Sequence, residues 1–292
     1  MLALQVVLSG ILIGGLYALV AVGLNLVFGV LRIINFAHGD YLMLGMYATY
    51  WLWQLGLDPY VSLVFVVPGL ALFGALSERF LIRYTLAAHA HVKIFVTLGL
   101  SLALQNLALL LFKADYLAIR VPYQTDVWRI FDLSASVPRL VAFAAMLAVT
   151  GGLFWFLRST DFGRAIRATA QNRETARLMG IDVDRVHMVT FAIGSALVGV
   201  AACLMMPIYS VFPTVGIDFV VAAFVIVVLG GLGSLHGALL GGLLIGVVEQ
   251  LSGYFIDTAL RQVVYFVVFM LVLAVRPAGL FGQRGAEEIG LK

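Results

Sequence analysis

Long apolar runs dominate the chain and alternate with short stretches that hold most of its charged and turn-forming residues. A lipid hydrocarbon core of ~30 Å requires ~20 mostly apolar residues in each helix that crosses it. The second and seventh of the runs are short, and the seventh has the length of a half-span, so the count ranges from eight to ten. The pattern predicts an all-α, polytopic membrane helix bundle of about nine spans that forms one domain over residues 1–292. The nine runs are 4–28, 41–56, 61–76, 93–111, 140–157, 189–206, 218–229, 237–255 and 262–275.

Composition supports a membrane protein. Of the 292 residues, 63% are hydrophobic and 11% are charged, whereas soluble domains have about 25% charged residues. The single cysteine, Cys203, excludes a disulfide framework and a cysteine metal cage. The first basic residue is Arg32, so the first run lacks the basic start of a cleavable signal peptide and is expected to remain in the mature protein.

The positions of Lys and Arg predict the orientation, because cytoplasmic loops keep positive charge. Placing residues 77–93 and 158–187 inside also puts Arg32 and the tail from Arg276 onward inside, with most of the 18 basic residues. The 113–139 loop, which mixes Arg and Asp residues, then lies outside. The sequence therefore predicts an N-terminus outside and a C-terminus inside.

Glycines recur four residues apart in the apolar runs. Such spacing lets membrane helices pack closely within one bundle and, less commonly, forms the face of a homodimer. We expect packing within the bundle. The pairs are Gly10 and Gly14, Gly237 and Gly241, and Gly242 and Gly246.

The segment 29–40 carries more polar residues than a simple turn between two spans needs: Arg32, Asn35, His38 and Asp40. Unwound backbone survives in lipid only where protein or water satisfies its polar groups, so one interpretation is a broken or re-entrant segment. The alternative is a loop whose side chains cap two helix ends, with Asp40 near the start of the next helix.

A second irregular segment, 230–237, is glycine-rich and also ends in His-Gly. No Gly-Lys-Ser/Thr follows its glycines, so a nucleotide-binding loop is poorly supported. The shared His-Gly at 38–39 and 236–237 hints at an internal duplication of the kind that transporters have.

Polar residues inside the predicted spans are few: Asn25, Gln105, Asn106, Glu249 and Gln250. A carboxylate deep in a span costs about 2.5–3.5 kcal/mol on insertion scales, so Glu249 should face protein or water rather than lipid. Our hypothesis is that Asn25 and Glu249 face the path of a solute. The alternative is a hydrogen bond between helices, or a contact between Glu249 and Arg261.

Catalytic and metal-binding patterns are missing from the sequence. There is no His-Glu-x-x-His, the five histidines are scattered, and Ser234 with His236 lacks a nearby acidic residue. We expect no enzyme activity, no catalytic residue, no metal, no cofactor and no nucleic-acid partner.

The segment 158–186 predicts two short helices on the cytoplasmic side. Asp161 is expected to cap the first, Asn172 to cap the second with Glu174 in its first turn, and Gly180 to end it. Two turns cannot hold a helix in water alone, so the second helix needs a tertiary surface or a partner. We favour docking onto a cytoplasmic protein over a basic loop that rests on anionic lipid headgroups.

Six short stretches, in chain order, resemble the permease subunits of bacterial branched-chain amino acid ABC importers. They are Gly15-Leu-Tyr-Ala-Leu with Asn35-Phe-Ala-His-Gly-Asp40; Gly163-Arg-Ala-Ile-Arg-Ala with Ala176-Arg-Leu-Met-Gly-Ile181; Leu229-Gly-Gly-Leu-Gly-Ser-Leu-His-Gly237; and Arg276-Pro-Ala-Gly-Leu-Phe-Gly282. The resemblance spans nearly the whole chain.

The resemblance implies a multi-pass subunit of the bacterial inner membrane and a set of partners. These are a second, related permease chain, two cytoplasmic ATP-binding subunits, and a periplasmic or lipid-anchored solute-binding protein. It also implies that the 158–186 loop holds the coupling helix that contacts the ATPase. The residues it assigns to this contact are Arg173, Glu174, Ala176, Arg177, Leu178, Met179 and Gly180.

The chain departs from the older importer signature, since it lacks the Glu-Ala-Ala opening and keeps only Ala176 and the glycine four residues later. The family's substrates include urea and short amides as well as amino acids.

An ion-coupled secondary transporter would need clustered acidic residues in the membrane, where Glu249 stands nearly alone. We therefore expect an ABC permease for a small amino acid, with a urea or amide permease as the alternative.

Overall fold

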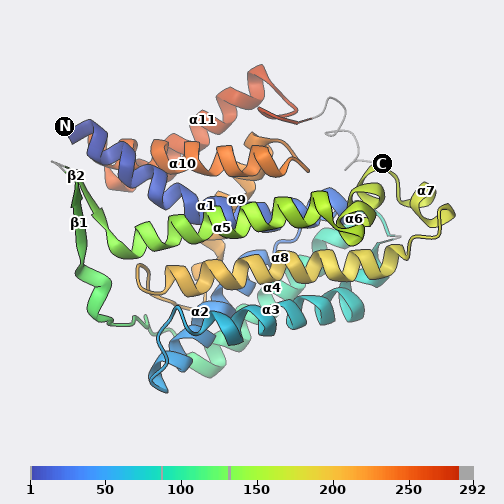
Figure 1. Ribbon diagram of the computed structural model, residues 1–292, viewed down its shortest axis with the longest axis horizontal. Helices are drawn as coiled ribbons and strands as arrows, with labels where there is room; N and C mark the ends of the chain where they lie inside the picture. The colour runs from blue at the N-terminus through green and yellow to red at the C-terminus, as the bar shows by residue number, and fades with distance from the viewer. Residues whose placement is uncertain (1, 87, 131–132, 283–292) are drawn as a thin grey trace.

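Long helices run side by side along one common direction to form the bundle (Figure 1). The computed structural model describes residues 2–86, 88–130 and 133–282. Helices account for all nine predicted apolar runs. The α-helices are α1 (Leu2–Leu31), α2 (His38–Gln54), α3 (Leu63–Ser77), α4 (Ala90–Phe112), α5 (Val137–Ser159), α6 (Asp161–Gln171), α7 (Arg173–Leu178), α8 (Val183–Met205), α9 (Val215–Gly230), α10 (Leu235–Phe255) and α11 (Arg261–Val275).

Shorter elements connect these helices. A π-helix, η1 (Glu78–Ile82), and a 3-10 helix, η2 (Arg83–Thr85), continue α3, while two further 3-10 helices are η3 (Pro122–Thr125) and η4 (Thr258–Leu260). Strands β1 (Val127–Ile130) and β2 (Leu133–Ser136) pair antiparallel, with Val127 opposite Ser136.

Seven helices in the described ranges are long and apolar enough to cross a membrane. Helix α9, with 16 residues, is shorter, and α2 has 17. The polytopic helical bundle predicted from the sequence is confirmed. Asp132 of the outer loop and the tail residues Arg284 and Lys292 lie outside the described residues.

The β1–β2 hairpin is a small element that the sequence analysis did not predict, within a structure that is all-α as expected. It lies at the end of the bundle that holds the N-terminus (Figure 1), where the side-chain amide of Gln5 accepts a hydrogen bond from Ser134 N at 2.9 Å. Strand pairing satisfies the backbone of this polar loop without burying an apolar run, which is why the hydrophobic pattern does not reveal it.

A second contact ties the 113–136 segment between α4 and α5 to the turn after α2. The Tyr123 hydroxyl donates to Asp58 Oδ2 at 2.8 Å, and the Tyr60 ring stacks on Tyr123 at 5.2 Å between centroids. Burial and the nearby Asp58 carboxylate raise the pKa of Tyr60 to about 12. The end of α2 therefore lies on the same side as the N-terminus.

Glycines bring α1 and α10 into direct backbone contact. Gly10 and Gly14 face Gly246 and Gly242, and a Cβ on Gly14 would lie 2.7 Å from the Gly242 carbonyl oxygen. Gly237 packs in the same way on Gly230 of α9. The three predicted glycine pairs therefore pack helices against each other within the bundle, as expected.

Two helices begin inside the bundle rather than at its ends. After α1 ends at Leu31, the chain turns back until His38 Nε2 lies 3.1 Å from the Val20 carbonyl oxygen, about 17 Å back along α1 at 1.5 Å per residue. Helix α9 begins after the partly buried segment 206–214, which follows α8, and the centroid of its Phe219 ring lies 6.1 Å from that of Tyr17. Helices α2 and α9 thus enter from opposite sides.

The starts of α2 and α9 meet at two glycines, Gly39 and Gly216, whose backbones touch. Helices α1 and α8 cross in a similar way at Gly23 and Gly194, where a Cβ on Gly23 would lie 2.9 Å from the Gly194 carbonyl oxygen. The α1–α2 pair and the α8–α9 pair therefore form an inverted arrangement. The spatial counterpart of Gly39 is Gly216 rather than Gly237.

We expect Gly14→Ala to destabilise the bundle by roughly 1–3 kcal/mol, because the added methyl group meets a backbone carbonyl that cannot rotate away. Thermal unfolding of the detergent-solubilised protein measures this. The matched control is Gly99→Ala in α4, where nothing lies within 4 Å. The control should stabilise the protein by up to about 1 kcal/mol, because alanine is the better helix former. Equal melting temperatures for the two variants would contradict the α1–α10 contact.

Candidate functional site

Helix α7 has strong local determinants at both ends. At its start, the Asn172 side chain accepts hydrogen bonds from the backbone N–H groups of Glu174 and Thr175, each at 3.0 Å. At its end, Gly180 has φ +82° and Ile181 N donates to the Ala176 carbonyl at 3.1 Å, which forms a Schellman motif with the Gly180 N–H on Arg177. The predicted cap and the predicted stop are both confirmed.

The predicted cap of α6 is wrong by one residue. Thr160, not Asp161, accepts from the Gly163 N–H, at 2.9 Å, and Thr160 has the extended backbone of a cap residue. Asp161 is the first helical residue, where its charge is favourable next to the helix N-terminus, and it pairs with Arg164.

The tip of the α7 loop is apolar and fully exposed. Leu178 and Met179 are 87% and 78% exposed, while Ala176 behind them is buried against the bundle. Arg173 and Arg177 are exposed on the same short helix. The loop projects from the end of the bundle opposite the β1–β2 hairpin (Figure 1). An exposed apolar tip with flanking cations at the end of a helix bundle is typical of a protein docking surface.

The segment between α1 and α2 is irregular and well buried. Arg32 has φ +55° and donates from Nη2 to the Ala170 carbonyl at 3.2 Å, so it fastens the break to α6. Asn35, His38 and Asp40 are almost completely buried. Asp40 lies in the first turn of α2 as expected, but no side chain caps this helix start, and Asp40 instead accepts from Gln105 Nε2 of α4 at 3.0 Å.

Asn35 differs from its neighbours. Its side chain is fully buried, and neither its oxygen nor its nitrogen has a hydrogen-bond partner in the described part of the chain. A buried amide in this state needs a bound water, a ligand or another conformation to satisfy it.

Asn25 binds the turn between α9 and α10. Its Nδ2 donates to the Ser234 carbonyl at 2.7 Å and to the Gly231 carbonyl at 3.3 Å, and its Oδ1 accepts from Gly233 N at 2.6 Å. These are the contacts of the inter-helix alternative. The C-terminal segment covers the same turn, since Leu280 N donates to the Leu229 carbonyl at 2.8 Å.

Glu249 lies apart from Asn25, in the second half of α10. Its carboxylate is half-buried and accepts from the Tyr17 hydroxyl at 3.2 Å. No ion pair to Glu249 forms among the described residues, and Arg261, the partner considered from the sequence, packs beside Gly253. The five predicted path residues therefore form three separate groups: Asn25; Asn35, His38 and Asp40; and Glu249.

Tyr17 is a site residue that the sequence did not single out. It lies inside the first apolar run, and its ring also contacts Phe219 of α9. The sequence offered one indication of its importance: Tyr17 is a hydroxyl-bearing residue inside a span, and it belongs to the Gly15-Leu-Tyr stretch that resembles the family.

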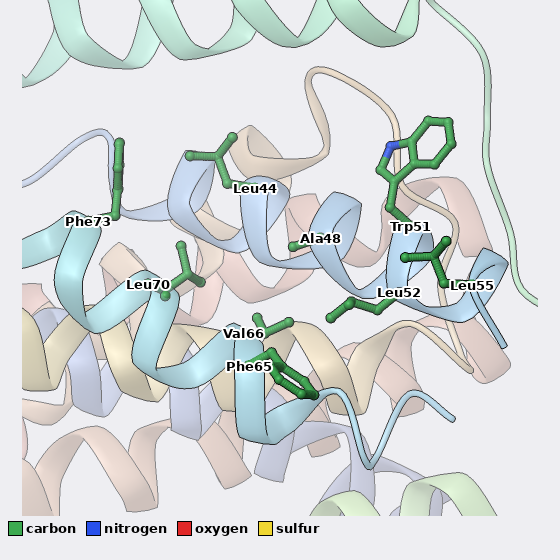
Figure 2. Close-up of a pocket in the computed structure, with 10 residues that line it drawn as sticks. Leu44, Ala48, Trp51, Leu52, Leu55, Phe65, Val66, Leu70 and Phe73 are labelled. Carbon is green, nitrogen blue, oxygen red and sulfur yellow. The ribbon is translucent and has the colours of Figure 1, made fainter. Parts of the chain in front are cut away.

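An apolar groove lies between α2 and α3 and has a volume of about 460 Å³ (Figure 2). Its walls carry no charged side chain, and Trp51, Leu55 and Phe65 at its mouth are exposed. Such a groove fits hydrocarbon rather than a polar solute, and we do not assign it to the solute path.

Comparison with known proteins gives one consistent family. Residues 6–273 match the family described as the permease component of branched-chain amino acid transport systems. The chain is 35% identical over 306 residues to the high-affinity branched-chain amino acid transport system permease protein LivH of Salmonella typhimurium, which covers 98% of this chain and 97% of that protein. It is 33% identical over 302 residues to the corresponding permease protein BraD of Pseudomonas aeruginosa, with 98% of each chain covered.

A shorter similarity reaches a second kind of permease. Over 161 residues the chain is 30% identical to the probable branched-chain amino acid transport permease protein LivM of Methanocaldococcus jannaschii, which covers 50% of this chain and 46% of that protein. No solved structure matches the chain significantly.

We expect Asn25→Ala to lower the free energy of unfolding by roughly 1–3 kcal/mol, because it leaves one N–H and two carbonyls of the α9–α10 turn without their side-chain partner. Thermal unfolding in detergent measures the loss. Asn106→Ala is the control, since Asn106 is exposed and bonds only to a carbonyl of its own helix. A melting temperature for Asn25→Ala as high as that of Asn106→Ala would exclude the anchoring role.

Proposed function

The chain belongs to the family of branched-chain amino acid transport system permeases, and on this premise we propose that it is one transmembrane subunit of an ABC importer. It carries a branched-chain or related amino acid across the bacterial inner membrane, and partner subunits hydrolyse the ATP. The relatives LivH and BraD are named for this transport and align with nearly the whole chain. Like them, the chain is a transport permease rather than an enzyme.

The exposed tip of α7 carries the proposal for ATPase docking. Leu178 and Met179 are apolar, exposed and held rigidly by the Asn172 cap and the Gly180 stop. A partner groove would bury these two side chains, while Arg173, Glu174 and Arg177 would meet its rim. Ala176 and Gly180 shape the loop from behind. An apolar centre with a charged rim is the usual anatomy of a protein interface.

The α7 end of the bundle is the cytoplasmic end in this proposal, and the hairpin end faces the periplasm. Six basic residues between 158 and 187 lie at the α7 end, as the positive-inside rule requires. With α2 and α9 counted as the two short spans, the chain crosses or enters the membrane nine times, with its N-terminus outside and its C-terminus inside.

The partners follow from the family. We propose a second, related permease chain, two cytoplasmic ATP-binding subunits and a periplasmic or lipid-anchored solute-binding protein. The similarity to LivM over half of this chain supports a paired permease of related sequence. The exposed apolar side chains of α4 and α11 would face lipid or that second permease.

Glu249 is the residue we propose to face the solute. It is a half-buried carboxylate within a span, its neighbour Tyr17 contributes a hydroxyl, and an amino acid brings an ammonium group that compensates its charge. Urea and short amides are neutral and need no such acid. Glu249 therefore favours the amino acid over the amide alternative. Asn35, with its unpartnered amide, is the second candidate for a solute contact.

We expect Leu178→Asp and Arg177→Glu to abolish co-purification of the ATP-binding subunits and to reduce uptake at least tenfold, because both changes alter the exposed tip and neither touches the core. Arg164→Glu, on the exposed face of α6, is the control and should retain both activities. Normal ATPase binding by both tip variants would overturn the docking assignment.

We expect Glu249→Gln to insert normally and to reduce the uptake of radiolabelled leucine at least tenfold, because it removes the charge that pairs with the ammonium group. Gln250→Ala, the neighbouring position on α10, is the control. Uptake of urea or acetamide that remains normal in Glu249→Gln would favour an amide permease instead.

A further inference from the structure

A buried acid lies at the inner end of α3 without a hydrogen-bond partner. Glu78 is fully buried, and neither carboxylate oxygen has such a partner in the described ranges. It begins the five-residue π-helix η1. Helical turns of this type are rare and occur frequently at functional sites. The acid is nevertheless within ion-pair distance of a cation, since Arg83 Nε lies 3.9 Å from Glu78 Oε1.

Arg83 connects this acid to the start of α8. Its Nη2 donates to the main-chain carbonyl of Asp184 at 3.3 Å. The Asp184 carboxylate accepts in turn from Arg177 Nη2 of α7 at 3.1 Å. A continuous series of polar contacts therefore runs from the α7 loop, across the start of α8, to the buried end of α3. We call Arg177, Asp184, Arg83 and Glu78 the inner relay.

The relay ends on α3 and α8, which are closely packed against each other. Gly74 of α3 faces Ser195 of α8, and a Cβ on Gly74 would also lie 3.2 Å from the Phe191 carbonyl oxygen. His187, one turn after Asp184 on α8, is buried, and neither ring nitrogen has a hydrogen-bond partner among the described residues. Because close-packed helices move as rigid bodies, a displacement of the start of α8 is passed on to α3.

The exposed part of the relay, the Arg177–Asp184 ion pair, contributes little to the free energy of folding. The side chains of Arg177 and Asp184 are 60% and 47% exposed, and exposed ion pairs add little to stability because water and salt screen them. The pair links two segments that otherwise touch lightly, since α7 has only one buried residue, Ala176. Loss of the pair should therefore remove the side-chain contact between α7 and the start of α8 without unfolding either helix.

We propose that the inner relay transmits movement of the docked ATPase from α7 to α3 and α8, with Asp184 and Arg83 as positioning residues. The proposal rests on the ATPase-docking role of α7. Arg177 receives the displacement at the docking surface, Asp184 carries it to the start of α8, and Arg83 with the buried Glu78 carries it to α3. A variant that breaks the relay behind the docking surface should separate ATP hydrolysis from transport.

The test uses the complete transporter in proteoliposomes with its ATP-binding subunits and solute-binding protein. Asp184→Asn removes the charge that pairs with Arg177 and keeps the main-chain carbonyl that binds Arg83. We expect normal co-purification of the ATPase, uptake reduced at least tenfold, and at least five times more ATP hydrolysed per solute transported. Glu78→Gln should show the same three results. Asp161→Asn, which breaks the exposed Arg164 pair on α6, is the matched control and should match the wild type in all three.

Normal uptake with a normal ATP-to-solute ratio in Asp184→Asn would overturn the relay, and that variant decides alone if Glu78→Gln fails to insert. Loss of ATPase co-purification in Asp184→Asn would also overturn it, because Asp184 would then act in docking. Failure of the proposed function is recognised separately, by normal ATPase binding in Leu178→Asp.

Discussion

Inside a membrane, a chain that leaves a helix must find partners for its backbone within the protein, because the hydrocarbon offers none. This chain leaves its helices twice at depth, at residues 32–37 and 206–214. Both breaks are enclosed by α1, α8 and the two short helices that follow them. The close approach of backbones at Gly39 and Gly216, and at Gly23 and Gly194, closes the space in which water or lipid would otherwise be needed.

The same constraint explains why some buried polar residues bind backbone groups and others do not. Asn25 satisfies the glycine-rich turn between α9 and α10, Arg32 satisfies a carbonyl of α6, and His38 contacts a carbonyl of α1. These side chains stabilise the first break and the α9–α10 turn. Polar groups that have no such task, above all Asn35 and Glu78, are the ones left to explain by function.

Much of the fold could be predicted from the sequence because lipid requires long apolar runs, and each of the nine runs became a helix. Asn172 and Gly180 were also predictable, since caps and stops depend on neighbouring residues. Thr160 and Asp161 are adjacent residues that can both cap, and only the backbone angles decide between them. The β1–β2 hairpin consists of two four-residue strands, which are too short to stand out beside the long apolar runs.

The parts of the sites that the sequence could not reveal depend on distant contacts. Asp184 and Arg83, the one distant link of the inner relay, lie about a hundred residues apart along the chain. Tyr17 and Glu249 are separated still further. Nothing in the local pattern indicates which of these side chains meet. The separation of the predicted path residues into three groups is a result of the same kind, because it depends on where the breaks place Asn35 and where α10 crosses α1.

The contact between Gly39 and Gly216 also has a consequence for biogenesis. Helix α2 leaves the ribosome early. The start of α9, which packs on the start of α2, is synthesised about 180 residues later. At roughly 5–20 residues per second, the first break waits about ten to thirty-five seconds for its cover. During that interval its unpaired backbone must be sheltered by the insertion machinery or by water, so the nascent first half is a substrate for quality control until α9 arrives.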